Sequence, residues 1–123
     1  MTDKSERAAR GARTFEEVLG SPMHPPTTPI TEAARDFVFA EVWARPGLDR
    51  RSRRWITLSA VCATGAELPM RTYIKAALDS GDITESELRE FALQFAVFQG
   101  FPKAVQIELL ISQVVAERAS KQV

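Results

Sequence analysis

Three side chains in this sequence are of types that move protons. His24 is the sole histidine, so any proton transfer by imidazole near neutral pH must use it. Tyr73 is the sole tyrosine, and a phenol with an ordinary pKa of about 10 donates a hydrogen bond or a proton but is a poor base at neutral pH. Glu90 is a candidate acid if burial raises the pKa of its carboxyl group.

Each of these residues also has an ordinary structural interpretation. His24 lies between prolines and a methionine, and a histidine in a loop is most often exposed to solvent. Tyr73 fits an amphipathic helix, with its ring buried and its hydroxyl in water. Glu90, like Glu85 and Glu87, is placed where a carboxylate stabilises the N-terminus of a helix. The residues alone leave both interpretations open.

The sequence weighs against metals, nucleotides and nucleic acids as cofactors or partners. One histidine and one cysteine, Cys62, leave no metal-ligand cluster within a chain. No glycine-rich phosphate loop and no Ser-His-Asp arrangement is apparent. Lys plus Arg equals Asp plus Glu at 16 each, so the chain lacks the positive field that favours nucleic acid or a membrane surface. We therefore expect no cofactor and no metal.

Composition also predicts where the protein is found and how it folds. The single cysteine cannot form an intrachain disulfide, and the N-terminal sequence is charged where a signal peptide would be apolar, which indicates a cytoplasmic protein. No run reaches the roughly 20 apolar residues of a membrane helix. With 123 residues, 45% of them hydrophobic, the chain is long enough to bury a core without staples.

The spacing of the apolar residues predicts an all-α fold, a small bundle of about six helices. Apolar residues recur at helical intervals, and no segment alternates long enough to indicate a strand. The predicted helices are 14–20, 31–43, 49–64, 67–80, 84–98 and 102–120. We expect residues 1–30 to form a flexible N-terminal tail, a short helix and a proline-rich strap, and residues 31–123 to form the helical domain.

Local signals account for the predicted helix boundaries. Thr14, Thr31 and Asp49 are N-cap residue types, and Thr84 with Glu87 forms a capping box. Helix ends are predicted at glycines able to adopt a left-handed conformation, namely Gly20, Gly81 and Gly100. Charge runs usually mark a solvated face, so Arg50, Arg51 and Arg54 are predicted to face water or to pair at the surface.

From Phe37 to the end of the last predicted helix, about two-thirds of the chain, the sequence resembles the carboxymuconolactone decarboxylase family. The residues that carry the resemblance are FAEVWARPGLD at 39–49, Arg53 with ITL at 56–58, AAL at 76–78, Glu87 and Glu90, and GFP at 100–102. The resemblance implies a small helical subunit with an alkylhydroperoxidase partner-like fold. It also implies self-association into a homo-trimer or homo-hexamer with sites at subunit interfaces.

Two chemistries are associated with this resemblance. One is cofactor-free decarboxylation of a carboxylated lactone in aromatic catabolism, and the other is thiol peroxidase chemistry that needs a Cys-x-x-Cys pair. Ala66 and Pro69 stand where that pair would be, which excludes dithiol chemistry within one chain. Tyr73 stands where the decarboxylase branch carries a histidine. A decarboxylase-like lyase is favoured, and a non-catalytic helical oligomer that binds a small acid is the alternative.

For a decarboxylase, the resemblance implies a set of site residues. Arg45 and Arg53 would anchor the substrate carboxylate, because guanidinium binds carboxylates in a bidentate way, although both also fit surface pairs with Glu41 and Asp49. Trp43 would line the substrate site, although aromatic residues more commonly belong to a core or an interface. The residues that donate and accept protons would be Tyr73 and Glu90, and His24 would be a further, less favoured candidate for proton transfer.

Overall fold

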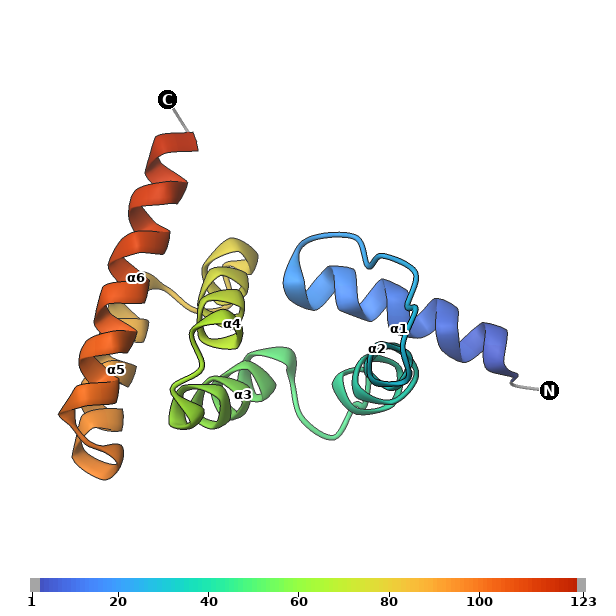
Figure 1. Ribbon diagram of the computed structural model, residues 1–123, viewed down its shortest axis with the longest axis horizontal. Helices are drawn as coiled ribbons and strands as arrows, with labels where there is room; N and C mark the ends of the chain where they lie inside the picture. The colour runs from blue at the N-terminus through green and yellow to red at the C-terminus, as the bar shows by residue number, and fades with distance from the viewer. Residues whose placement is uncertain (1–2, 122–123) are drawn as a thin grey trace. The chain divides into compact units, whose positions relative to one another are not determined.

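The computed structural model describes residues 3–121, and these form six α-helices and one π-helical segment (Figure 1). No strand occurs among them, so the predicted all-α fold of about six helices is confirmed. The chain divides into two compact units, with the division between Arg50 and Arg51. The predicted domain boundary after residue 30 lies within the first of these units and stays a prediction.

The first unit begins with α1 (Lys4–Leu19), which starts well before the predicted helix at 14–20. Thr14 is therefore not an N-cap. It is a buried residue inside the helix, and Asp3 caps the N-terminus by accepting a hydrogen bond from the backbone N–H of Glu6. The end at Gly20 is confirmed, with a left-handed φ of 81°. The early start has a tertiary cause, because residues before Thr14 pack on a later segment.

That segment is η1 (Ala34–Trp43), a π-helix against which α1 packs closely. A Cβ placed on Gly11 would lie 1.9 Å from the backbone oxygen of Arg35, so only glycine allows this crossing. Arg10 donates from Nε to the backbone oxygen of Ala40 at 2.9 Å and from Nη2 to Glu41 at 2.7 Å. These contacts join residues far apart in sequence, which local periodicity does not reveal.

The predicted helix at 31–43 is divided and starts earlier. Its first part is α2 (Pro29–Ala33), with Pro29 in the first turn and Thr28 as the N-cap. Thr31 is the third residue of a capping box rather than the predicted N-cap, because Thr28 holds the extended conformation that a cap requires. Residues 21–28, which include His24, form neither helix nor strand.

Most of the second unit is built from four helices whose boundaries follow the sequence signals. These are α3 (Arg50–Thr64), α4 (Glu67–Ser80), α5 (Glu85–Gln99) and α6 (Phe101–Lys121). The Thr84–Glu87 capping box and the left-handed Gly81 are confirmed. Gly100 has a positive φ of 101°, but its ψ of 151° is extended, so it turns the chain without the predicted left-handed helical geometry.

The hydrophobic core lies in the second unit, where all four helices contribute to it. Its fully buried members include Leu58, Cys62, Met70, Ile74, Leu88, Ile107 and Ile111. Each such aliphatic side chain contributes about 1.5–3 kcal/mol relative to an exposed position. Helices α5 and α6 lie side by side (Figure 1), and α4 packs on α6. None of the helices within residues 3–121 has the length and apolar character needed to cross a membrane.

Candidate functional site

Three of the predicted site residues lie in the first unit. His24 is exposed in the segment between α1 and α2, and Arg45 is exposed just after η1. Trp43 is buried at the end of η1, where its ring stacks on Phe39 with centroids 6.3 Å apart. Phe39 in turn meets Phe15 of α1 edge to face. Trp43 therefore packs in an aromatic stack within this unit, as the interpretation of Trp43 as a core residue predicts.

The other three predicted site residues lie in the second unit, on three different helices. Arg53 is half-buried on α3, Tyr73 is half-buried on α4, and Glu90 is exposed on α5. Glu90 lines an open groove with Trp55 and Phe91, and neither Arg53 nor Tyr73 lines that groove. The structure therefore does not bring Glu90 and Tyr73 together in this groove, and their roles stay predictions.

Tyr73 packs against the core, and two features of its surroundings shift the pKa of its hydroxyl in opposite directions. Burial raises the pKa of Tyr73 above its ordinary value, because the phenolate loses its hydration. The positive charge of Arg54 acts the other way by favouring the phenolate. Burial has the larger effect, so Tyr73 is a protonated phenol at neutral pH. It is equipped to donate a proton and not to accept one.

The position of Arg54 corrects the sequence prediction of a solvated side chain. Its side chain is 2% exposed, and Nε donates to Oδ2 of Asp82 at 2.7 Å. The signal was present in the sequence, since Arg54, Leu58 and Cys62 recur at intervals of four along one face of α3. A charge run suggested a wet face, but the helical period places this one arginine on the buried side. Neither Arg54 nor Asp82 was among the predicted site residues.

Arg51 and Glu87 form a surface pair at the start of α5. Arg51 donates from both terminal nitrogens to the two carboxylate oxygens of Glu87, at 3.0 and 2.7 Å. These bonds, together with the backbone N–H of Thr84, lower the pKa of Glu87 to about 2. Glu87 is therefore ionised at all but the most acidic pH. This agrees with the interpretation of Glu87 as a carboxylate that stabilises the helix N-terminus.

Cys62 lacks the surroundings of a reactive thiol. It is fully buried on the core side of α3, and burial raises its pKa to about 12. The thiolate is the nucleophilic form, so this side chain is inert at neutral pH. Within residues 3–121, no three His, Cys, Asp or Glu side chains gather where they would hold a metal ion.

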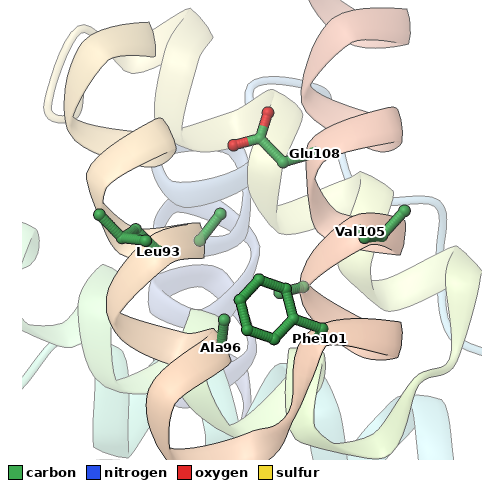
Figure 2. Close-up of a pocket in the computed structure, with 7 residues that line it drawn as sticks. Leu93, Ala96, Phe101, Val105 and Glu108 are labelled. Carbon is green, nitrogen blue, oxygen red and sulfur yellow. The ribbon is translucent and has the colours of Figure 1, made fainter.

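An apolar hollow of about 170 Å³ lies between α5 and α6 (Figure 2). It is lined by Ala92, Leu93, Ala96, Phe101, Ala104, Val105 and Glu108. The one carboxylate, Glu108, already accepts a hydrogen bond from Arg89 at 2.5 Å. None of the predicted site residues lines this hollow, and its chemistry suits apolar contact rather than the binding of an acid.

Comparison with known proteins bears on the reaction class. The family model described as Carboxymuconolactone decarboxylase family matches residues 29–111. The nitrosuccinic acid decarboxylase of Metarhizium robertsii is 29% identical over 119 residues, which cover 90% of this chain and 82% of that protein. The 4-carboxymuconolactone decarboxylase of Acinetobacter baylyi is 36% identical over 66 residues, covering 54% of this chain and 48% of that protein. An uncharacterised 15.0 kDa protein of Paracoccus denitrificans is 35% identical over 79 residues, 63% of this chain and 58% of its own length.

Proposed function

Because the chain belongs to the carboxymuconolactone decarboxylase family, we propose that it is a carboxy-lyase that removes CO2 from a small carboxylated lactone or related cyclic acid. The family match across residues 29–111 carries the proposal. Two relatives named as decarboxylases of different acids support decarboxylation as the reaction class. A role in aromatic catabolism follows if the acid is a lactone of that kind.

The proposed reaction needs no cofactor. When the bond to the carboxylate carbon breaks and CO2 leaves, the electron pair stays on the substrate and is delocalised over its carbonyl. The protein must then hold the acid in place and deliver a proton. We assign the anchoring of the carboxylate to Arg53 and Arg45, and the proton to the phenol of Tyr73. Glu90, His24 and Trp43 are kept as secondary candidates.

Tyr73 is the favoured proton donor because it is protonated at neutral pH and half-buried against the core. A phenol in this setting donates a proton when a stronger base, such as a carbanion, forms beside it. An imidazole would serve as acid and base near neutral pH, whereas a phenol serves only as the acid. A decarboxylase requires only the acid function after CO2 has left.

The proposal is tested with the purified chain and with the two acids that the names of its relatives give as substrates, 4-carboxymuconolactone and nitrosuccinic acid. CO2 release is measured for wild type and for Arg53→Ala, Tyr73→Phe and Arg50→Ala. We expect Tyr73→Phe to lower kcat by about 100-fold or more, and Arg53→Ala to lower kcat/KM by about 10- to 100-fold. Arg50→Ala is the matched control, since Arg50 pairs with Glu17 at the surface of the first unit. No CO2 release by wild type from 4-carboxymuconolactone contradicts the proposed substrate class, and no release from either acid contradicts the proposed reaction.

The alternative function is a non-catalytic oligomer that binds a small acid. It is favoured by the loss of both the cysteine pair and the helix histidine that the resemblance leads us to expect. The two functions differ in one measurement. A non-catalytic member binds the acid, with an affinity that Arg53→Ala weakens, and releases no CO2.

We propose in addition that copies of the chain associate through the apolar surface of α5 and α6. We call this surface the α5–α6 face, defined by the exposed residues Leu93, Val97, Phe98, Phe101, Val105 and Leu109. Each of these side chains is more than half exposed. Monomeric proteins rarely present so many large apolar side chains on two adjacent helices, because the apolar area in water is unfavourable.

A second copy of the chain is the occupant that fits this face. The same surface carries both the hollow between α5 and α6 and the large exposed side chains that line it, Leu93, Phe101 and Val105 (Figure 2). In a two-fold interface the same surface of each copy meets the other, so apolar side chains of one copy can contact the apolar hollow of its partner. Arg89 pairs with both Glu85 and Glu108, which lines the hollow, so one guanidinium partly compensates the two carboxylates near this face.

A further inference from the structure

The open groove that Glu90 lines has a volume of about 410 Å³ and one aromatic wall. One side chain of α3 and five of α5 line it, namely Trp55, Ser86, Glu87, Glu90, Phe91 and Gln94. Trp55 and Phe91 are both half-buried, and the centroids of their rings lie 5.6 Å apart. Phe91 in turn packs beside the buried Phe95, with centroids 5.8 Å apart. A groove of this volume has room for a small organic molecule.

The aromatic wall is restrained by contacts of Arg51. The Arg51 guanidinium lies over the Trp55 ring, 5.6 Å from its centroid. The same guanidinium donates to both carboxylate oxygens of Glu87, at 3.0 and 2.7 Å, and to the backbone oxygen of Asp82 at 2.6 Å. Trp55 therefore contacts a fixed guanidinium as well as the Phe91 ring. Because these contacts restrict the wall before a ligand arrives, binding loses less conformational freedom.

The two carboxylates of the groove differ in how their charges are compensated. Glu87 is bound by Arg51, whereas Glu90 is exposed and forms no salt bridge with any residue between 3 and 121. Arg89, the cation next to Glu90 along α5, is bound to Glu85 and Glu108 instead. An exposed carboxylate is charged at neutral pH. The groove therefore carries one uncompensated negative charge beside its aromatic wall, which favours a positively charged occupant.

The polar side chains of the groove lie in a row along α5. Ser86, Glu90 and Gln94 follow one another at intervals of four residues, so they occupy successive turns on one face of the helix. Their hydroxyl, carboxylate and amide oxygens all accept hydrogen bonds from an N–H donor. A ligand that is charged at one end and apolar at the other complements both the polar row and the aromatic wall.

We propose that this groove binds a small organic cation, an amine or quaternary ammonium compound with an aromatic or alkyl body. The cationic group lies at the Glu90 carboxylate, and the body packs on Trp55 and Phe91. A carboxylate is disfavoured in the groove because Glu90 repels it. The inference is independent of the proposed decarboxylation, since neither Arg53 nor Tyr73 lines the groove. It gives Glu90 a role other than proton transfer.

Benzyltrimethylammonium is the probe, because it joins a quaternary ammonium group to a phenyl ring. Its binding to the full chain is measured from the fluorescence of Trp55, with Trp55→Phe as the blank that reports the other tryptophan, Trp43. The groove is open and covers only part of a ligand, so we expect saturable binding with a Kd on the order of 1 mM. Benzyl alcohol and phenylacetate carry the same ring without a charge and with a negative charge. We expect the alcohol to bind more weakly than the cation, and phenylacetate to bind most weakly.

Three substitutions at exposed positions of α5 test where the cation binds. Glu90→Gln is expected to weaken binding of the cation about five-fold and to leave binding of benzyl alcohol unchanged. Gln94→Arg places a guanidinium one turn after Glu90, where the two pair along the helix, so the cation is expected to be excluded. Glu85→Gln is the matched control, since it removes a carboxylate from the same helix that is bound to Arg89 and does not line the groove. Circular dichroism checks that each variant is folded.

The possible outcomes separate the site from the class of its ligand. Equal affinity for the cation in wild type and Glu90→Gln, or an equal loss in Glu85→Gln, overturns the role of Glu90. Benzyl alcohol or phenylacetate binding as tightly as the cation overturns the cationic class. No saturable binding by wild type overturns the site itself. Since no acid is turned over in these measurements, their failure leaves the proposed decarboxylation to its own test.

Discussion

Glu87 combines two contacts that hold its carboxylate in the ionised form. It completes the capping box with Thr84 at the start of α5, and it accepts both terminal N–H groups of Arg51 from α3. The two contacts join the N-terminus of one helix to the side of another. Because both favour the charged form, the pKa of Glu87 falls from its ordinary value to about 2.

We predict that Glu87 contributes stability that disappears in acid. A group whose pKa is lower in the folded chain stabilises it above the unfolded pKa, and this contribution is lost as the pH falls through the folded value. The free energy of unfolding should therefore differ most between wild type and Glu87→Gln near pH 7, and the difference should narrow from about pH 5 toward pH 2. Urea titrations at several pH values measure this difference.

Glu90→Gln is the matched control, since Glu90 is exposed on the same helix. Its free energy of unfolding is expected to follow that of wild type throughout the same pH range. A difference between wild type and Glu87→Gln that stays constant from neutral to acid pH contradicts the prediction.

At the scale of elements, the close crossing of α1 and η1 decides how the first unit packs. Gly11 lets the two helical backbones approach at the carbonyl of Arg35, and Arg10, the residue before it on α1, donates a hydrogen bond to the carbonyl of Ala40. Glycine inside a helix normally costs about 1 kcal/mol relative to alanine. Here that cost is offset by an approach that no side chain permits.

We predict that Gly11→Ala destabilises the first unit, although the substitution favours an isolated helix. The added Cβ meets backbone and cannot be relieved by a rotamer change, so a loss of about 1–3 kcal/mol is expected. Amide hydrogen exchange in α1 measures the effect. Ala9→Gly, at an exposed position on the same helix, reports the intrinsic preference alone. Slower exchange in Gly11→Ala than in wild type contradicts the prediction.

At the scale of the whole molecule, the chain buries a well-defined core and still exposes the α5–α6 face. The core side of α5 and α6 holds residues such as Leu88, Ile107 and Ile111, while the outer side of the same helices holds Phe98 and Phe101. These helices are therefore apolar on two sides, and among the residues described in the second unit the other helices cover the core side while the outer side stays exposed.

We predict that a charge placed on the α5–α6 face separates the copies. Val97→Glu or Phe98→Glu should reduce the mass measured by sedimentation equilibrium to that of a single chain, 13.7 kDa, because a carboxylate buried in an apolar contact loses its hydration. Leu68→Glu, at an equally exposed position on α4, should leave the mass unchanged. A wild-type chain that sediments as a monomer at every concentration removes the proposal.

Much of the fold was predictable because helix boundaries are set by nearby residues. The capping box of Thr84 and Glu87 at the start of α5 and Gly81 at the end of α4 each act within a turn of the helix that they bound. Where the prediction was wrong, at the starts of α1 and α2, the deciding residues were Asp3 and Thr28, which lie just before the positions considered. The family was likewise identified from the sequence, and the family model matches residues 29–111.

The sequence by itself determined the helical elements, their main breaks and the family, since these depend on local pattern and residue type. Only the tertiary structure decided which distant residue pairs with a buried charge and which apolar surfaces remain uncovered. Arg54 is buried because α3 turns it toward the core and Asp82 lies within reach, although the two are far apart in sequence. Such pairings depend on how separate helices meet, and helical period and composition do not specify that.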